Sequence, residues 1–566
     1  MNDSVLFLVL RRMRAPLIAM ILVYAISVFG LVLIPGVDAD GKPTPPMTFF
    51  DAFYFISYTA STIGFGEIPN AFSYAQRFWV TVCIYLTVIA WTYAILNILN
   101  LLKDEGLQRA LATNRFARKI RRMSEPFCIV CGAGETGSLI CRTLDQVQMR
   151  FVVIDHRPEP LHELELGDYH ADVPALLADA QTPGNLLLAG LQMKSCKAVL
   201  AVTNSDDVNL AIAMNVRLLN PGIPIIARAE HAAVATNMQS FGTNFIVDPY
   251  ALYARRLALA IRNPAGFQLA ECLTRVPETP IPEMPMPPTG RWIVCGYGHF
   301  GRAIVRELDA LGLHDQVTII DPRPTAPDDH QAILSQGTES SPLIDAGIAH
   351  AVGLVAGSDN DINNLSIAIT ARELNPKLFV VMRQNTAANS VLFERFDADL
   401  TMITTRTIAH ACLSYLTTPM LGRFIREIEQ HPADWSSSIL KTLQPCCKGE
   451  VPFVWRLQIN RAKSPALTTA LLADHEALTL RTLLTSNRQR DERLPLVALM
   501  LERSGHLTLL PPDDFALANG DKILFAGPRD AWNEQKVTAQ NANALEYVLH
   551  GHATTGSLLG KLIGHN

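Results

Sequence analysis

Two long stretches of this sequence lack any charged residue. Residues 15–34 give twenty consecutive uncharged positions, and residues 78–102 give twenty-five. Each stretch is long enough to cross a hydrocarbon core of about 30 Å, so we expect two membrane spans. The first is not expected to be a cleaved signal peptide, because its apolar stretch is too long and no small-residue cleavage site follows it.

The composition also lacks the marks of several other protein classes. The net charge is -5 and the sequence pI about 6.3, which gives no support for a nucleic-acid partner. The ten cysteines lie in scattered apolar contexts. Cys128 and Cys131 form a CxxC within a predicted strand, where residues three apart point to opposite faces and cannot share a metal ion. We therefore expect reduced core thiols.

Basic residues flank the two spans on one side only. Arg11, Arg12 and Arg14 precede the first span, and seven basic residues follow the second, whereas the connecting loop has few. The positive-inside rule then places both termini in the cytoplasm. The seven are Lys103, Arg109, Arg115, Arg118, Lys119, Arg121 and Arg122.

The loop between the spans contains a short aromatic segment, residues 48–60, which is only about half as long as a membrane span needs to be. We predict a re-entrant pore helix. Residues 62–66 (TIGFG) follow it, and such a Gly-rich extended strand can remove water from a cation with its carbonyl groups. Gly64 and Gly66 suit this role because glycine adopts the left-handed backbone that turns successive carbonyls toward one axis.

About 460 residues remain for soluble domains, enough for two or three. They contain an internal repeat: the segment from Pro126 (PFCIVCGAGETG) reappears about 164 residues later (RWIVCGYGHFG). Strand-like and helical stretches alternate in both copies, which predicts two parallel α/β sheets of the dinucleotide-binding type. In the first copy we expect strands near residues 127–131, 151–154, 198–202, 223–227 and 245–247.

Each copy opens with a glycine fingerprint placed between a strand and a helix. The glycines are Gly132, Gly134 and Gly137 in the first copy and Gly296, Gly298 and Gly301 in the second. An acidic residue ends the next strand of each copy, Asp155 or Asp321. Glycines allow close approach of a pyrophosphate and a carboxylate accepts ribose hydroxyls, which favours NAD or an adenine nucleotide over NADP. The alternative is that the glycines only pack the helix against the strand, and this is the stronger alternative in the second copy.

Further segments complete the chain. The Pro-rich residues 277–288 predict a stiff linker between the copies. Residues 408–429 predict one long crossover helix. The tail after it is strand-rich, with a turn at residues 519–521, whereas the first copy has only a short stretch before its linker.

The TIGFG string resembles the potassium-channel signature TVGYG, and the two copies resemble RCK domains, the regulators of potassium conductance. The resemblance implies a pore module at 1–102, a linker at 103–125, a first RCK domain at 126–276, a second at 289–430 and a C-terminal α+β lobe at 431–566. It also implies that carbonyls of Thr62, Ile63, Gly64 and Phe65 bind K⁺, with the Thr62 hydroxyl adding a ring of ligands at the inner end. Phe65 lacks the hydroxyl that usually ties the filter to its pore helix, so filter rigidity and strict selectivity over sodium are open questions.

The same resemblance implies a nucleotide site in each RCK copy. Its residues are Gly132, Gly134, Glu135, Thr136, Gly137, Asp155, His156, Arg157 and Asp179 in the first copy, and Gly296, Gly298, Gly301 and Asp321 in the second. Asp179 lies in an ADA segment that is similar to the family's GDA. The second copy has Gln336-Gly337-Thr338 at that place. Ca²⁺ is a further ligand of such rings, without a readable motif.

Further expectations concern residues near the predicted pore. Glu67 stands where many family members carry Asp and would give carboxylates at the outer mouth. Asn97 and Asn100 either face an aqueous vestibule or bond neighbouring helices. No glycine lies between Phe78 and Glu105, so the hinge of many relatives is absent, and no arginine ladder indicates voltage sensing.

The sequence therefore predicts a homotetrameric, ligand-gated potassium channel of the inner cell membrane, whose eight RCK domains form a cytoplasmic ring. It is not expected to be an enzyme. The alternatives are a membrane-tethered NAD-dependent oxidoreductase, which would not need a filter and for which no catalytic acid/base set is visible, and a nucleotide-sensing subunit of a separate transporter, which would not need a filter of its own.

Overall fold

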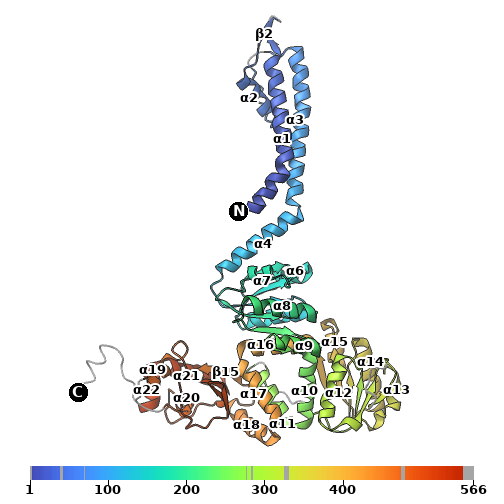
Figure 1. Cartoon of the computed structure of the whole chain (residues 1–566), viewed down its shortest axis with the longest axis vertical. Coiled ribbons are helices and arrows are strands. Elements are labelled where there is room, and N and C mark those ends of the chain that lie inside the picture. The colour runs from blue at the N-terminus through green and yellow to red at the C-terminus, as the bar shows by residue number, and fades with distance from the viewer. Residues whose placement is uncertain are drawn as a thin grey trace, which may run out of the picture. The chain divides into compact units, whose positions relative to one another are not determined.

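The structure is a computed structural model, and it describes residues 3–38, 42–68, 71–275, 277–281, 285–323, 330–472 and 478–551. The chain divides into two compact units, the first ending at Arg122 and the second beginning at Met123 (Figure 1). The first unit contains the predicted spans and the second contains the repeat. Each unit is described by itself.

Two long helices dominate the first unit and pack side by side (Figure 1). They are α1 (Asp3–Leu33) and α3 (Tyr74–Leu102), and both contain stretches long and apolar enough to cross a membrane, 13–33 and 74–101. Gly30 leaves room for the indole of Trp79, whose Nε1 donates to Ser27 O at 3.2 Å. Large apolar side chains on both helices are exposed, Phe29 to 66% and Phe78 to 73%, as expected for surfaces solvated by lipid.

The start of α3 lies four residues before the predicted start of the second span. Ser73 caps it: the Ser73 hydroxyl accepts from Gln76 N and the Gln76 side chain accepts from Ser73 N, at 3.3 and 3.2 Å. This capping box satisfies the first backbone donors of the helix. The helix therefore begins in the polar segment ahead of its apolar stretch.

The aromatic segment is helical, as predicted. Helix α2 (Phe49–Ala60) is capped by Thr48 and buries Ala52, Phe55 and Ile56. Those residues join a core with Val28 and Leu31 of α1 and Val80 and Cys83 of α3. A small hairpin of β1 (Pro35–Val37) and β2 (Pro43–Pro46) precedes α2. The predicted linker after α3 is mostly a helix, α4 (Glu105–Arg122).

The second unit contains two parallel sheets of six strands with the same strand order. The first has the order β5-β4-β3-β6-β7-β8 and the second β11-β10-β9-β12-β13-β14. This is the doubly wound order in which ligands bind at the carboxyl ends of the first and fourth strands, which confirms the predicted fold.

The bounds of the first copy's elements are as follows. The strands are β3 (Phe127–Cys131), β4 (Arg150–Asp155), β5 (Ala175–Leu177), β6 (Cys196–Ala201), β7 (Ile225–Arg228) and β8 (Phe245–Val247). The helices are α5 (Glu135–Gln146), α6 (Pro158–Leu166), α7 (Pro183–Leu188), α8 (Asp206–Leu219), α9 (Ala232–Ser240), α10 (Pro249–Arg262) and α11 (Pro264–Thr274).

The second copy repeats this pattern. Its strands are β9 (Trp292–Cys295), β10 (Val317–Ile320), β11 (Gln331–Ile333), β12 (Gly353–Ala356), β13 (Phe379–Gln384) and β14 (Leu400–Ile403). Its helices are α12 (His299–Ala310), α13 (Ser340–Asp345), α14 (Asp361–Leu374), α15 (Ser390–Phe396), α16 (Thr404–Thr417) and α17 (Pro419–Gln430), with 3-10 turns η1 (His314–Gln316), η2 (Ile348–His350) and η3 (Ala387–Asn389).

The predicted single helix over 408–429 is wrong, because two helices, α16 and α17, occupy this region. They meet at Thr418, whose φ and ψ are -140° and 71°. Pro419 explains the break, since its ring disfavours helical backbone in the preceding residue. The break lets the two helices pack against different partners.

The copies exchange helices. Ile408, Ala409 and Cys412 of α16 are buried in the core of the first copy, beside Val130 and Leu144. Tyr415 of α16 also stacks on Phe245 of β8, with ring centroids 4.2 Å apart. In return α10, which follows the first copy's last strand, packs on α12 of the second copy, as Figure 1 shows.

The core of the second copy contains the residues that α10 contributes. Tyr250, Ala254 and Leu257 pack there with Trp292 and Phe300. Each copy therefore completes its hydrophobic core with a helix that follows the other copy's sheet. This pairing of distant segments is invisible to any local pattern in the sequence.

The C-terminal lobe has an antiparallel sheet of order β15-β18-β16-β17, as the strand-rich tail predicts. Its strands are β15 (Phe453–Gln458), β16 (Val497–Arg503), β17 (His506–Leu509) and β18 (Lys522–Gly527), and its helices are α18 (Ala433–Cys446), α19 (Pro465–Leu472), α20 (Leu480–Leu484), α21 (Arg529–Gln540) and α22 (Ala542–His550). The predicted turn at residues 519–521 is present, with Gly520 at φ 97°. The first copy contributes α11 to the core beneath this sheet.

The Pro-rich segment is paired with the C-terminal lobe over its described residues. Glu278 N donates to Val451 O at 2.9 Å, and Val451 N donates to Thr279 O at 2.8 Å. Residues 282–284 of this segment lie outside the described residues. The linker is therefore anchored at its start, in addition to being stiffened by its prolines.

The ten cysteines are free thiols and nine of them are buried. Burial raises the pKa of Cys128 and of Cys295 to about 12. These thiols carry little thiolate at neutral pH and are poor metal ligands and nucleophiles, in agreement with the sequence-based prediction of inert core thiols.

Candidate functional site

The segment Thr62–Gly66 follows α2 directly and has an alternating backbone. Thr62, Gly64 and Gly66 have φ of 61°, 65° and 75°, whereas Ile63 and Phe65 lie outside the left-handed region. Alternation of left- and right-handed residues turns successive carbonyls to the same side of the strand. This is the arrangement that a carbonyl-lined cation path requires.

The pore helix holds this segment through Tyr58. The main-chain N–H groups of Ile63 and Gly64 donate to Tyr58 O at 3.0 and 3.2 Å. The Tyr58 hydroxyl donates to the carbonyl of Glu67 at 2.7 Å, and its ring meets Phe65 edge-on at 6.0 Å. Tyr58 therefore contacts four residues here: Ile63, Gly64, Phe65 and Glu67.

This contact bears on the missing hydroxyl of Phe65, while selectivity over sodium stays an open prediction. Phe65 has no hydroxyl to reach the pore helix, but the pore helix has a hydroxyl that reaches past Phe65. Tyr54 adds a second bond, from its hydroxyl to the Glu67 carboxylate at 3.2 Å. The sequence contains the signal, two tyrosines four residues apart in a helix, although its meaning depends on the fold of the loop.

Asn97 and Asn100 lie in the last two turns of α3. The Asn97 amide donates to Tyr93 O of its own helix at 2.8 Å. Asn100 is exposed in the single chain. Their roles toward a vestibule or a neighbouring helix stay predictions.

Two of the three glycines of the first fingerprint are needed by the fold itself. Gly132 has φ of 101°, and a Cβ on it would lie 3.1 Å from Thr203 Cα. A Cβ on Gly137 would lie 1.9 Å from the carbonyl oxygen of Gly132. These two glycines allow the tight turn and the close packing of α5 on β3, as the structural alternative proposed.

Gly134 is different, because the fold does not require it. Its φ and ψ are -62° and -169°, a backbone open to other residues. The nearest atom to a Cβ there is Arg157 Nη2 at 3.4 Å. Gly134 is also the N-cap of α5 without a side-chain cap, so the first N–H groups of the helix keep free donor capacity. The missing side chain leaves room for an anion at this helix end.

Asp155 lies at the carboxyl end of β4 and fixes the shape of the glycine turn. Its carboxylate accepts from Ala133 N at 2.6 Å and from Arg157 N at 2.8 Å. The side chain is only 3% exposed. Each oxygen still has a lone pair for a further donor, such as a ribose hydroxyl.

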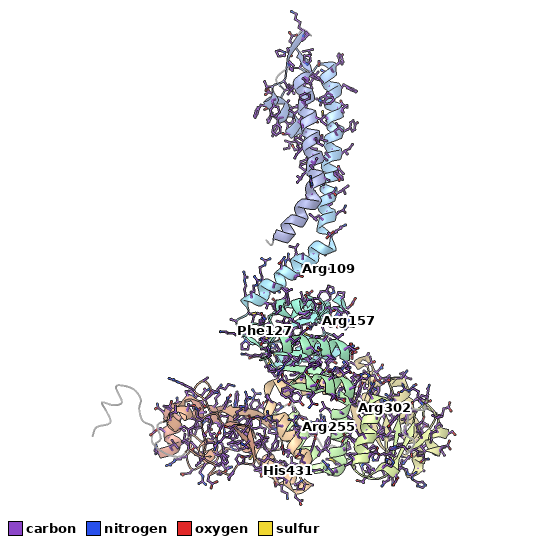
Figure 2. The ribbon with its side chains drawn as sticks, viewed as in Figure 1. Arg109, Phe127, Arg157, Arg255, Arg302 and His431 are labelled. Atoms are coloured by element: carbon purple, nitrogen blue, oxygen red, sulfur yellow. The ribbon has the colours of Figure 1, made fainter. Side chains whose placement is uncertain are left out.

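The other predicted residues of the first copy lie at the same edge of the sheet. Glu135 is exposed in the first turn of α5 and Thr136 is buried beside it. His156 and Arg157 follow Asp155, with side chains 72% and 46% exposed. Arg157 is labelled in Figure 2. Asp179 is exposed after β5, where it caps its own turn by accepting from Gln181 N at 2.8 Å.

The second copy has the same geometry. Gly296 has φ of 94°, and a Cβ on Gly301 would lie 1.9 Å from Gly296 O. Gly298 has φ of -75°, and a Cβ on it would have no other atom within 4 Å among the residues that the structure describes. The middle glycine is again unexplained by packing, which weakens the structural alternative for this copy too.

Asp321 takes the place of Asp155. It accepts from Tyr297 N at 2.6 Å and from Arg323 N at 2.8 Å, and Arg323 Nε lies 3.3 Å away. Burial by itself raises the pKa of Asp321, but these donors outweigh it and the pKa is lowered. The carboxylate is therefore held ionised. Gly337, in the segment that differs between the copies, has φ of 74°.

Sequence reasoning missed one residue in each copy that positions the site. The amide of Asn209 is fully buried and donates to Thr203 O and Arg228 O at 3.0 and 3.1 Å. Asn364 does the same for Ser358 O and Arg383 O at 2.9 and 2.8 Å. Both hold the loop that packs against the first glycine of the fingerprint. Their signal is the asparagine that recurs six residues after this loop begins in both copies.

Comparisons with known proteins match the regions of the chain in which these candidate sites lie. Residues 17–104 match the family described as "Ion channel", and residues 128–249 and 292–404 match the TrkA-N domain family. The chain thus has one region similar to ion channels and two regions of Rossmann-like fold that are similar to TrkA-N domains.

Two curated relatives come from Methanocaldococcus jannaschii. "Potassium channel protein 1" is 26% identical over 38% of this chain and 63% of its own length. "Probable potassium channel protein 2" is 25% identical over 43% of this chain and 65% of its own length. The chain thus matches less than two thirds of the length of these relatives.

Among solved structures, "GsuK channel bound to NAD" is 16% identical, covering 95% of this chain and 100% of its own with a TM-score of 0.44. This overall likeness is too low to support an inference.

Proposed function

We propose that the chain forms a potassium-selective channel of the cell membrane, and not an enzyme, whose pore is opened or closed by nucleotide binding to its RCK domains. The observation that carries the proposal is the alternating backbone of Thr62–Gly66, held by α2 between two apolar helices. Carbonyls of Thr62, Ile63, Gly64 and Phe65 are the proposed K⁺ ligands.

A single chain cannot surround an ion, so the proposed channel is a homotetramer with eight RCK domains. The apolar side chains of Ile63 and Phe65 support assembly, because they are 61% and 63% exposed in one chain at a depth where neighbouring protein is expected to cover them. The orientation, with both termini and the RCK domains cytoplasmic, rests on the flanking basic residues.

The test of conduction uses the full chain in liposomes or planar bilayers. Reversal potentials under opposed potassium and sodium gradients should follow the potassium gradient. Gly64→Ala should abolish the current, because a left-handed backbone costs an L-residue roughly 1–2 kcal/mol, and the added methyl narrows the path. The matched control is Ile63→Val, which keeps the backbone and should conduct normally. A reversal near zero in asymmetric cations would refute selectivity.

The proposed nucleotide site of the first copy consists of the uncapped end of α5, the room above Gly134, the Arg157 guanidinium and Asp155. The dipole and Arg157 favour the phosphates, and Asp155 favours a free 2'-hydroxyl, hence NAD or an adenine nucleotide. The second copy offers the same elements at Gly298, Arg323 and Asp321. Ca²⁺ sites stay a prediction that nothing in the geometry of the described residues favours.

Binding is tested by calorimetry with NAD, ADP and NADP on the full chain in detergent. Arg157→Ala removes a phosphate donor and a 3.6 Å ion pair from Nε to the Asp155 carboxylate, but it keeps the main-chain bond from Arg157 N to Asp155. One lost charge-assisted bond to phosphate should weaken binding by about 1.5–3 kcal/mol. Arg323→Ala tests the proposed site of the second copy in the same way, and the matched control is Lys194→Ala, which removes an exposed cation ahead of β6, outside both proposed sites. Equal affinities in the parent and both arginine variants would place the ligand elsewhere.

Helix α4 is the proposed route from ring to pore, since it joins α3 to the first strand of the first copy. A shift from mostly closed to mostly open needs about 5.5 kcal/mol, which four to eight sites can share at about 1 kcal/mol each. A Gly/Ser insertion after Glu105 should leave nucleotide affinity unchanged and remove its effect on open probability. A full response in the lengthened channel would show that coupling takes another route.

A further inference from the structure

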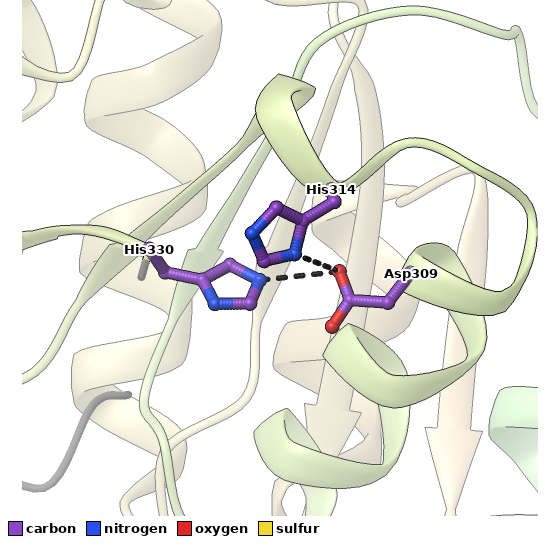
Figure 3. Close-up of side chains that lie close together, drawn as sticks. All are labelled: Asp309, His314 and His330. Atoms are coloured by element: carbon purple, nitrogen blue, oxygen red, sulfur yellow. Dashed lines mark hydrogen bonds and ion pairs between the residues drawn. The ribbon is translucent and has the colours of Figure 1, made fainter. Parts of the chain in front are cut away.

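Three metal-ligating side chains of the second RCK copy converge at one point (Figure 3). Asp309 lies in the last turn of α12, His314 opens the turn η1, and His330 immediately precedes β11. All three lie at the amino-terminal ends of β10 and β11. The cluster is therefore at the opposite edge of the sheet from the Gly296 turn, and it belongs to no site described above.

The two histidines approach the same carboxylate oxygen. Asp309 Oδ1 lies 3.3 Å from His314 Nδ1 and 3.1 Å from His330 Nε2. One ligand atom from each of the three residues lies within 4.8 Å of the others, and the two rings meet edge-on with centroids 4.1 Å apart.

These separations are longer than those of two hydrogen-bonded His–Asp pairs in the chain, whereas a third pair, His156 Nδ1 and Asp155 Oδ1, lies 3.5 Å apart. His170 Nδ1 lies 2.8 Å from Asp145 Oδ2, and His231 Nδ1 lies 2.8 Å from Asp206 Oδ2, as expected for charge-assisted hydrogen bonds. In a tetrahedral zinc site with bonds of about 2.0–2.1 Å, ligand atoms lie about 3.3–3.4 Å apart. The Asp309 distances are closer to the second value than those of the paired histidines.

The first copy provides an internal comparison. Asp145 occupies the place of Asp309, 164 residues earlier, and has a single histidine partner, His170. In the second copy the connection after the helix is longer and contains His314. Beside this aspartate, the first copy thus has one histidine, which forms a hydrogen-bonded pair. The second copy has two, so that three side chains can each offer a ligand atom.

We propose that Asp309, His314 and His330 bind a divalent transition-metal ion of the zinc class, with a water in the fourth position. Two imidazoles and one carboxylate suit Zn²⁺ and disfavour Ca²⁺ and Mg²⁺, which take oxygen ligands. His330 is 3% exposed, whereas His314 and Asp309 are 37% and 30% exposed. One ligand is therefore buried and held in place, and the other two can be reached by an ion from solvent.

The ion fixes the carboxyl end of α12 to the edge of the sheet. The amino end of the same helix, about 18 Å away at 1.5 Å per residue, carries the Gly298 turn. Occupancy of the metal site would therefore restrain α12, the helix whose amino end forms part of the proposed second nucleotide site. The metal site itself is independent of conduction and can be measured whether or not the chain is a channel.

The experiment uses the full chain, purified in detergent without a polyhistidine tag and stripped with a chelator. Zn²⁺ binding is measured by calorimetry and by metal content after gel filtration. His314→Ala and Asp309→Asn should each lower the affinity of one site by roughly a hundredfold, since loss of even an outer-shell partner costs 10–100-fold. The matched control, His170→Ala, should bind as the parent does.

A spectroscopic arm begins with the parent chain, whose result does not depend on how the variants fold. Co²⁺ added to the stripped parent chain should give the intense visible bands of four-coordinate cobalt, and His314→Ala should lose them while His170→Ala keeps them. Weak six-coordinate bands in the parent chain, or the same Zn²⁺ content and affinity in the parent and in Asp309→Asn, would overturn the proposal and leave a hydrogen-bonded cluster.

Discussion

The hydroxyl of Tyr58 donates to the main-chain carbonyl of Glu67 at 2.7 Å, so the pore helix is bonded to the outer end of the proposed filter. The bond spans Gly64 and Phe65 and involves a carbonyl next to the proposed ion path. In the proposed channel, the filter is thus supported from α2 by a hydroxyl that the aromatic residue of the TIGFG string does not supply.

Tyr58→Phe should weaken the filter without disturbing its packing. The ring remains against Phe65, while one hydrogen bond worth about 1 kcal/mol is lost. We expect lower potassium-over-sodium selectivity in reversal-potential measurements and faster loss of current. Tyr54→Phe is the control, because its bond is longer and reaches a side chain. Identical selectivity in both variants would show that the Glu67 carbonyl does not need this bond.

Gly134→Ala and Gly137→Ala should separate ligand binding from folding. Gly134 has room for a methyl group and an unstrained backbone, so its variant should keep the melting temperature and lose at least about tenfold, or 1.4 kcal/mol, of nucleotide affinity. Gly137 has a carbonyl 1.9 Å from the methyl position, so its variant should be strongly destabilised. Thermal unfolding and calorimetry measure the two effects. Full affinity in Gly134→Ala would assign this glycine a purely structural role.

Ile408→Ala should destabilise the first copy although it lies after the second. The side chain is fully buried in the first copy's core, and removing such a group costs about 2–5 kcal/mol. Hydrogen exchange should report the loss at β3 and β6, more than at β9 and β12. Leu257→Ala is the reciprocal control, because α10 serves the second copy. Loss of protection confined to the second sheet would contradict the exchange of helices.

Acid should weaken the turn that Asp321 holds. Its pKa is lower in the folded chain than in the unfolded chain, so the unfolded chain takes up the proton first as the pH falls. The stabilisation is complete above the unfolded pKa of about 3.9 and is lost as the pH falls through the folded value. The difference in melting temperature between the parent and Asp321→Asn should be largest at neutral pH and narrow below about pH 4. A melting-temperature difference that stays constant from neutral pH down to about pH 3 would show that the ionised Asp321 does not stabilise the turn.

Local patterns in the sequence were sufficient for much of this fold. Uncharged runs, the glycines at 64 and 66, and the acidic residues Asp155 and Asp321 at the carboxyl ends of two strands each depend on neighbours within a few residues. The cap at Ser73 and the break at Pro419 are local too, and they correct the predicted bounds of two helices.

Other features depend on contacts between residues far apart in the chain. Tyr58 meets Glu67 only after the loop has folded back, α16 reaches the first copy across some 200 residues, and His330 joins Asp309 through sheet pairing. Periodicity and composition do not reveal such long-range contacts. The candidate nucleotide site could be predicted from the sequence because its residues occur in both copies of the repeat. The proposed metal-binding cluster occurs in one copy only.

The exchange of α10 and α16 also sets an order of events during synthesis. The first sheet is complete at Val247, but the helix that covers its core ends at Thr417, 170 residues later. At 5–20 residues per second, the ribosome needs roughly ten to thirty seconds to make that stretch. For this interval the nascent chain keeps an uncovered apolar face, which chaperones or neighbouring chains can bind. Commitment of the first copy to its native state therefore waits for translation of the second.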